Sequence, residues 1–286
     1  MKNYFLTKLV TQGFCVFKQA FLTHELDCFH NITNQAINSI SLGHRIRNKS
    51  QGSKIPVSNY PDLSKLISHP NLLKIFNDLE FTNIRFSSGF IISKSKNGPP
   101  LFWHQDWWGW NNPISYTDQI IQIFVMIYLQ DTNKANGCLR VLPGSHRTSH
   151  WIHNSKEAHS EDISRFDNPN EQVYQSIDGE FAIEVKYGDV VIGDARLLHG
   201  TFSNSSDAER SLITLWFHPN YEQIPASLQA RIYELFKRRS VEGVPDKKND
   251  ITFIDWPEKD KNLIEPFSPL PIKDIMAEEW NRNPKW

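Results

Sequence analysis

The sequence has few cysteines and no surplus of basic charge. Cys15, Cys28 and Cys138 are odd in number and form no C-x-x-C spacing, which argues against a disulfide framework or a zinc knuckle. Lysine and arginine number 31 against 32 aspartates and glutamates, giving a formal charge of −1. Proteins that grip a nucleic-acid backbone carry a basic surplus. Nucleic acid is therefore not expected as a partner.

Long hydrophobic runs and linkers are also missing. No apolar run approaches the roughly 20 residues of a membrane span, and Lys2 and Lys8 interrupt the start before a signal-peptide core can form. We therefore predict a soluble, cytoplasmic protein without a membrane partner. No Gly/Ser-rich stretch divides the 286 residues, and β folds with appended helices reach this length as one domain. We expect a single domain over 1–286, of unknown oligomeric state.

The apolar periodicity changes from helix to strand near residue 81. The first part predicts a strand over 13–17, a helix from Thr23, a polar loop over 41–60 and helices over 61–79 broken at Pro70. Short strands are then predicted at 81–92, 119–129, 138–142, 181–185, 190–192, 197–202 and 211–217. This pattern predicts a mainly β fold with flanking helices, a jelly-roll core over 81–218 between an N-terminal part (1–80) and a C-terminal helix with an aromatic, Pro-rich tail (219–286).

The densest chemistry lies in the stretch from Phe102 to Trp110. His104 and Asp106 are two residues apart, so on an extended segment their side chains leave the same face. One more histidine would complete the two-histidine, one-carboxylate set of non-heme Fe(II) oxygenases. The sequence therefore indicates a metal site that lacks one ligand.

A later run supplies a candidate for that ligand. On a strand, His199 shares its face with Thr201, and a polar hairpin over 203–209 would return Arg210 to the neighbourhood of Thr201. A guanidinium group binds a carboxylate bidentately, and a hydroxyl can donate to the same group. Each residue taken alone could instead have a purely structural role. His199 could be a hydrogen-bonded core residue, Thr201 an ordinary strand residue and Arg210 a surface residue.

These residues together carry a family resemblance. His104-x-Asp106, His199, Thr201 and Arg210, with the run N-G-C-L-R-V-L-P-G-S-H-R over 136–147 between them, resemble the phytanoyl-CoA dioxygenase family of Fe(II)/2-oxoglutarate oxygenases. The resemblance implies a double-stranded β-helix (cupin-like jelly roll) that holds Fe(II) by the three ligands. It also implies that Arg210 and Thr201 bind the far carboxylate of the cosubstrate 2-oxoglutarate, with O2 as second cosubstrate.

The implied reaction is hydroxylation of an unactivated C–H bond of a small molecule, with release of succinate and CO2. Related halogenases replace the carboxylate ligand with a small residue. Because Asp106 is present here, the resemblance favours hydroxylation over halogenation. The alternatives are a sensor that binds metal and 2-oxoglutarate without turnover, and an oxygenase acting on an acyl-CoA or a macromolecule. For the phosphates of an acyl-CoA, Lys94, Lys96 and Arg147 are only weak candidates.

Substrate contacts are predicted less sharply. Tryptophan packs wherever it lies, yet indoles beside the metal favour Trp108 or Trp110 as pocket residues, and Gln122 and Met126 share a face of the central strand. The polar stretch near 147–180 predicts a lid-like insert. Residues 146–160 contain His146, His150, His153 and His159, and the first three, at i, i+4 and i+7, could in principle gather a second metal on a helix. A cover over the active site is the more ordinary interpretation. The tail could wrap the barrel, cover the site or form a dimer contact.

Overall fold

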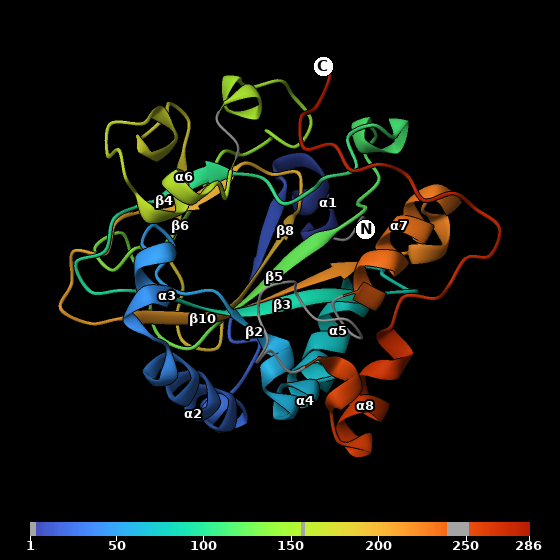
Figure 1. The fold of residues 1–286 in the computed structure, drawn as a ribbon, viewed down its shortest axis with the longest axis horizontal. Coiled ribbons are helices and arrows are strands. Elements are labelled where there is room, and N and C mark those ends of the chain that lie inside the picture. The colour runs from blue at the N-terminus through green and yellow to red at the C-terminus, as the bar shows by residue number, and fades with distance from the viewer. Residues whose placement is uncertain (1–3, 156–157, 239–251) are drawn as a thin grey trace.

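Two antiparallel sheets lie one above the other at the centre of the molecule (Figure 1). The structure, a computed structural model, describes residues 4–155, 158–238 and 252–286. The larger sheet has the order β1-β8-β5-β10-β3-β2, formed by Phe14–Phe17, Val190–Asp194, Ile123–Tyr128, Arg210–His218, Arg85–Lys94 and Ile55–Pro56. The smaller sheet has the order β4-β9-β6-β7, formed by Leu101–His104, His199–Thr201, Leu139–Val141 and Phe181–Ile183. The predicted jelly roll with flanking helices is therefore confirmed.

The central strand of the larger sheet shows how the core is divided. Every residue of β5 is buried, and the strand pairs with β8 on one side and β10 on the other. Successive side chains of a strand point to opposite faces. Thus Ile123, Val125 and Ile127 join the apolar cluster under the helices, whereas Phe124 and Met126 join the cluster that faces the smaller sheet. The predicted central strand over 119–129 is confirmed with shorter bounds.

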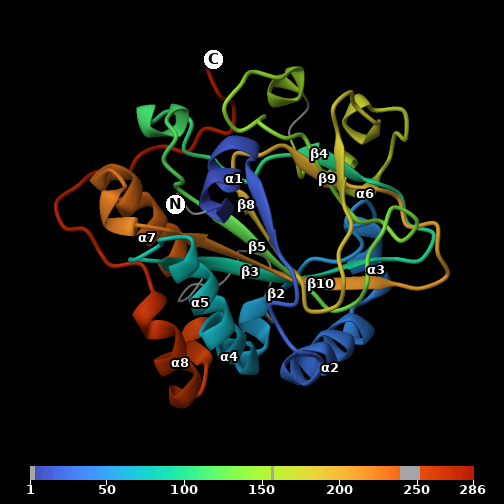
Figure 2. The same cartoon turned by 180° about the vertical axis from the view of Figure 1, so that it is seen from behind.

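Helices cover the outer side of the larger sheet. The helices of the described residues are α1 (Tyr4–Gln12), α2 (Thr23–Ser39), α3 (Leu42–Arg47), α4 (Ser64–Ile67), α5 (Pro70–Asp78), α6 (Glu161–Arg165), α7 (Ala226–Lys237) and α8 (Glu258–Ile264). Figure 1 shows α2, α4, α5 and α8 on the side away from β4 and β6, and Figure 2 shows α1 beside β8 from behind. None of the helices in the described part of the chain is long and apolar enough to cross a membrane.

The prediction of an uninterrupted loop over 41–60 is wrong. This stretch contains α3 and the short strand β2. A six-residue helix is too short to show an apolar repeat, and tertiary contacts stabilise it instead. Its N-terminus is capped by Ser41, whose Oγ accepts a hydrogen bond from the His44 amide (3.1 Å), and Arg45 forms an ion pair with Glu209 (2.8 Å). Helix α1 was not predicted from the sequence.

Two segments outside the sheets reach the end of β4. The insert packs on β4, where the Trp103 indole N–H donates to the Gln175 carbonyl (2.9 Å). The last ten residues, 277–286, which we call the C-terminal strap, run beside the segment that follows β4. Asn281 forms a parallel bridge with Gly109 and donates its amide to the Trp108 carbonyl (2.7 Å). Of the roles left open for the tail, the strap therefore follows the edge of the jelly roll, and its Trp280 and Arg282 also line a cavity beside Asp106.

Candidate metal centre

The register of the smaller sheet brings the three candidate ligands together. His104 ends β4, His199 begins β9, and the two residues are paired across the strands. Nε2 of His104 lies 3.7 Å from one carboxylate oxygen of Asp106, and Nε2 of His199 lies 3.6 Å from the other. One potential ligand atom from each residue lies within 4.8 Å of the other two. Among the described residues, these three side chains form a group that could hold a metal ion.

Hydrogen bonds orient both imidazoles toward the shared point. Nδ1 of His104 lies 3.0 Å from the Phe102 carbonyl, and Nδ1 of His199 lies 3.0 Å from the Leu197 carbonyl. A carbonyl can only accept, so each Nδ1 carries the proton and each Nε2 presents its lone pair. Burial, reinforced by the neighbouring His199, lowers the pKa of His104 to about 3. The His104 ring is therefore neutral near pH 7, as a metal ligand must be.

The carboxylate is positioned as firmly as the imidazoles. The indole N–H of Trp216, on β10, donates to Oδ2 of Asp106 (2.9 Å). The Asp106 amide donates to the Ala195 carbonyl (2.7 Å), which ties the segment after β4 to the turn before β9. Such outer contacts fix ligand orientation and raise metal affinity. Sequence inspection missed Trp216, because an indole on an apolar strand gives no sign that its N–H meets a ligand.

A small cavity of about 40 Å³ continues from the two histidines to Arg210 and Thr201. Arg210 begins β10 and is 2% exposed, and one of its N–H groups donates to the Gly137 carbonyl (2.7 Å). Among the described residues, its Nε and the hydroxyl of Thr201 are buried without a hydrogen-bond partner. An unpaired buried polar group costs about 1–3 kcal/mol. Two such groups facing one cavity fit an anionic ligand that reaches from the metal position to Arg210.

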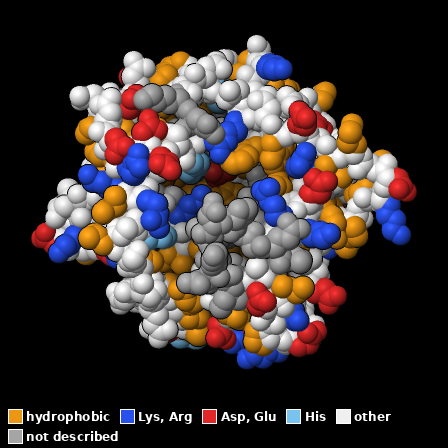
Figure 3. Space-filling view, viewed as in Figure 1, with side chains coloured by type: hydrophobic (Ala, Val, Ile, Leu, Met, Phe, Trp, Pro, Cys, Tyr) orange, Lys and Arg blue, Asp and Glu red, His pale blue; other side chains and the backbone are white. Residues whose placement is uncertain are grey.

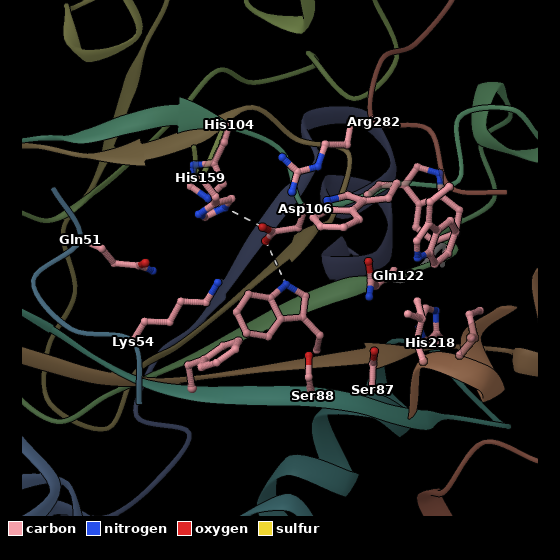
Figure 4. Close-up of a pocket in the computed structure, with 17 residues that line it drawn as sticks. Gln51, Lys54, Ser87, Ser88, His104, Asp106, Gln122, His159, His218 and Arg282 are labelled. Carbon is pink, nitrogen blue, oxygen red and sulfur yellow. Dashed lines mark hydrogen bonds and ion pairs between the residues drawn. The ribbon is translucent and has the colours of Figure 1, made fainter. Parts of the chain in front are cut away.

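A larger cavity of about 200 Å³ opens on the other side of Asp106. Figure 4 shows the residues that line it. They come from distant parts of the chain, including Gln51, Lys54, Ser87, Ser88, Phe90, Trp108, Gln122, His159, Trp216, His218, Trp280 and Arg282. Sequence inspection missed Lys54, which lay in a predicted loop, and Arg282, which lay in the tail. Neither position carried a periodic or motif signal.

The four predicted substrate residues lie in three different places. Trp108 and Gln122 line the larger cavity, and Met126 lines the small one. Trp110 instead lies in an aromatic cluster with Tyr116 and Trp286, at ring distances of 5.4 and 5.7 Å. It is 1% exposed and borders none of the cavities described here. The contacts of all four with substrate stay predictions.

The insert histidines do not gather at one point. Nε2 of His146 lies 3.0 Å from the Val10 carbonyl, and Nδ1 of His153 accepts the amide of His150 (3.1 Å). His159 stands apart and packs its ring edge-on against His104, with centroids 5.0 Å apart. Burial, followed by the positive charge of Lys54, lowers the pKa of His159 well below its usual value. The insert therefore contributes a neutral imidazole to the cavity wall.

Comparisons with known proteins point to one family. The family model described as phytanoyl-CoA dioxygenase matches residues 9–212. Phytanoyl-CoA dioxygenase 1 of Oryza sativa subsp. japonica is 29% identical over 160 residues, 54% of this chain and 52% of that protein. A probable alpha-ketoglutarate-dependent hypophosphite dioxygenase of Stutzerimonas stutzeri is 25% identical over 159 residues, 54% of this chain and 52% of that protein. The chain thus matches about half the length of these curated relatives.

The fold has solved counterparts. The non-heme alpha-ketoglutarate-dependent carbocyclase SnoK from nogalamycin biosynthesis superimposes with a TM-score of 0.57 at 20% identity, covering 76% of this chain and 84% of that one. At this identity the likeness concerns the fold alone. It agrees with the double-stranded β-helix formed by the two sheets.

Proposed function

This chain belongs to the phytanoyl-CoA dioxygenase family, and we propose that it is an Fe(II)- and 2-oxoglutarate-dependent oxygenase that hydroxylates a small molecule. The single observation that carries the proposal is the continuity of the site. A His-Asp-His group of ligand geometry joins, through one small cavity, the unpaired Nε of Arg210 and hydroxyl of Thr201. A metal-chelating dicarboxylate is a ligand that satisfies both ends.

The residues of the chain would act as positioning groups. His104, Asp106 and His199 would hold Fe(II) on one face, and Arg210 and Thr201 would bind the outer carboxylate of 2-oxoglutarate. Bound together, iron, 2-oxoglutarate and O2 supply the oxidation of a C–H bond coupled to decarboxylation to succinate and CO2. The indole N–H of Trp216 would keep Asp106 oriented, and the buried position of both histidines excludes water from the ligand side.

The dimensions of the larger cavity favour a small substrate. Its volume of about 200 Å³ lies below the roughly 300–1,000 Å³ of pockets for drug-sized ligands. Two of the three residues considered for binding the phosphates of an acyl-CoA are already engaged in other contacts. Lys94 is 1% exposed and donates to the Ser50 carbonyl, and Arg147 is ion-paired with Asp118. The two relatives and the solved counterpart are named as a phytanoyl-CoA dioxygenase, a probable hypophosphite dioxygenase and a carbocyclase, so they do not select a substrate.

The first test compares variants of the candidate metal ligands with a control variant, so that loss of metal binding can be distinguished from a general loss of protein structure. Under anaerobic conditions, Fe(II) and 2-oxoglutarate should produce the visible absorption of their chelate in the wild-type protein. His104→Ala and Asp106→Ala should abolish it, and His24→Ala, at an exposed position on α2, should not. If both ligand variants keep iron- and 2-oxoglutarate-dependent succinate formation, the assignment is wrong.

A second measurement separates an enzyme from a sensor. The wild-type protein is incubated with O2, 2-oxoglutarate and a metabolite extract. An oxygenase forms succinate in step with a product 16 mass units heavier than its substrate. A sensor that binds metal and 2-oxoglutarate shows the chelate absorption but no coupled product.

A further inference from the structure

A third cavity lies between the insert and the C-terminal strap. Its volume is about 330 Å³, and we call it the strap cavity. Gln105 reaches it from the segment after β4, His153 from the insert and Asn281 from the strap. Among the described residues, His104 is the one that it shares with the small cavity. The strap cavity therefore borders the metal centre but does not overlap with the expected position of 2-oxoglutarate.

His153 offers the strap cavity a hydrogen-bond donor. The residue is 6% exposed, and burial, followed by the neighbouring His150, lowers its pKa to about 4, so the ring is neutral near pH 7. Nδ1 accepts the amide of His150 (3.1 Å), and a neutral imidazole carries its single proton on the other nitrogen. Nε2 of His153 is therefore an N–H group, and it is buried without a hydrogen-bond partner among the described residues.

Gln105 offers the same cavity an acceptor. Its Nε2 donates to the Arg282 carbonyl (2.8 Å). Because a carbonyl can only accept, this hydrogen bond determines which end of the Gln105 amide faces the strap. Oε1 is left at the other end, buried and without a hydrogen-bond partner in the described part of the chain. Buried polar atoms are normally paired, so the donor of His153 and the acceptor of Gln105 both fit a partner from outside the chain.

The charges around the strap cavity favour a neutral partner. The described residues that line it include no Lys, Asp or Glu. Arg282 is engaged within the protein, because its guanidinium stacks on the Trp108 ring, 3.8 Å from the centroid, and donates to the Ala158 carbonyl. An anionic group would meet the lone pairs of Gln105 Oε1, and a cationic group would meet the proton on His153 Nε2. A neutral group that both accepts and donates a hydrogen bond satisfies both atoms.

The strap cavity adjoins the larger cavity. The residues that border both are His104, Trp108, His159, Trp280 and Arg282. Figure 4 shows three of them, His104, His159 and Arg282, grouped around Asp106. On the face of the molecule in Figure 3, hydrophobic side chains as well as Lys and Arg border a hollow near the middle. With the strap cavity, the room for a substrate enters the range of roughly 300–1,000 Å³ that pockets for small organic ligands have.

We propose that the strap cavity binds the polar end of the substrate, through a neutral group that both accepts and donates a hydrogen bond, such as a hydroxyl or an amide. This inference rests on the proposed oxygenase function. The group would accept the N–H of His153 and donate to Oε1 of Gln105. The rest of the substrate would lie along Trp108 and Trp280, which border both cavities, and would reach the metal from there.

The test compares pairs of molecules that differ in their ability to donate. Benzyl alcohol with benzyl methyl ether, and phenylacetamide with N,N-dimethylphenylacetamide, are titrated by ligand-observed NMR into protein loaded with Zn(II) and 2-oxoglutarate. The alcohol or the amide should bind, and its methylated counterpart should bind about threefold more weakly or worse, because it cannot donate to Gln105. The pair that shows the larger difference distinguishes a hydroxyl from an amide substrate.

Variants then assign the binding to His153 and Gln105. His153→Asn keeps an acceptor for the His150 amide but removes the N–H at the ε position, and it should weaken probe binding about three- to tenfold. His153→Gln keeps a donor at the ε position and should retain most of the binding. Gln105→Met should also weaken it. His24→Asn, at an exposed histidine on α2, is the matched control and should bind as the wild type does.

The metal provides a check on where the probe binds. Because His104 borders the strap cavity, paramagnetic Mn(II) in place of Zn(II) should broaden the NMR signals of the bound probe. The inference is overturned if neither the alcohol nor the amide binds at millimolar concentration, as in a cavity that holds water alone. It is also overturned if the methylated molecules bind equally well, if Mn(II) causes no broadening, or if His153→Asn binds as well as His153→Gln.

The proposed function fails by a different result, the absence of the Fe(II)–2-oxoglutarate absorption in the wild type. That readout does not depend on the strap cavity. The chelate absorption should persist in both His153 variants, which shows that their metal centre is intact.

Discussion

Replacing Arg210 by methionine tests the 2-oxoglutarate site most directly. The guanidinium is 2% exposed, its Nε has no hydrogen-bond partner among the described residues, and another of its N–H groups donates to the Gly137 carbonyl. A hydrogen bond to a charged group contributes about 1.5–3 kcal/mol. Losing one such interaction weakens binding by roughly 10- to 150-fold. We expect the dissociation constant of 2-oxoglutarate to rise by this factor in Arg210→Met.

The stability of the ligand-free protein distinguishes a binding role from a structural one. A buried charge without a full set of partners gives little net stability, and an apolar residue of similar volume is often tolerated or stabilising. Arg210→Met should therefore melt at the same temperature as the wild type, or higher, without ligand. The rise in Tm caused by 2-oxoglutarate in the wild type should shrink, because that rise follows affinity.

The assay is an anaerobic titration of the chelate absorption with 2-oxoglutarate, together with thermal melts with and without ligand. Metal affinity, measured with Mn(II) alone, should stay unchanged because Arg210 is not among the ligand candidates. Thr201→Val keeps the shape of the side chain and removes the hydroxyl, so it should give a smaller loss, about two- to tenfold. Unchanged 2-oxoglutarate affinity in Arg210→Met, or a large fall in its ligand-free Tm, would refute the reasoning.

Two further predictions concern the neighbours of the metal centre. Trp216→Phe removes the N–H that donates to Asp106 (2.9 Å) and should lower metal affinity by about 10- to 100-fold, measured by competition with a chelator; a change below twofold would mean that Asp106 needs no such support. Gly109→Ala would place a Cβ 2.3 Å from the Trp107 ring and should cost about 1–3 kcal/mol in unfolding free energy. Gly43→Ala, whose new Cβ meets nothing closer than 3.5 Å, is its control in denaturant titrations, and equal effects of the two would contradict the packing argument.

Sequence reasoning succeeded where the periodicity of a strand determines geometry. Alternation along β9 places His199 and Thr201 on one face, and the hairpin before β10 returns Arg210 to the same cavity, where the structure has all three. The jelly roll and its central strand followed from the same alternation. These are short-range rules, in which the side-chain direction follows from the position in the strand.

The contributions of Lys54, His159 and Arg282 could not be predicted from local pattern. Each lies in a segment without a repeat, and each reaches the cavity through tertiary contacts: the His44 hydrogen bond for Lys54, the ring contact with His104 for His159, and the stack on Trp108 for Arg282. Such contacts join residues far apart in the sequence. The neighbouring residues in the sequence therefore do not predict which partner each of them contacts.

This difference divides the site into two parts with different constraints. The candidate metal and 2-oxoglutarate residues lie on strands or directly after one, where hydrogen-bonded register holds them in place. The cations of the larger cavity lie on connecting segments, which tolerate change because few ladder bonds depend on them. Substitutions at Lys54 or Arg282 can therefore alter the charge of the cavity wall without moving His104 or His199. The strap, held to Gly109 and Trp108 by backbone hydrogen bonds, provides a wall that can vary while the metal centre stays constant.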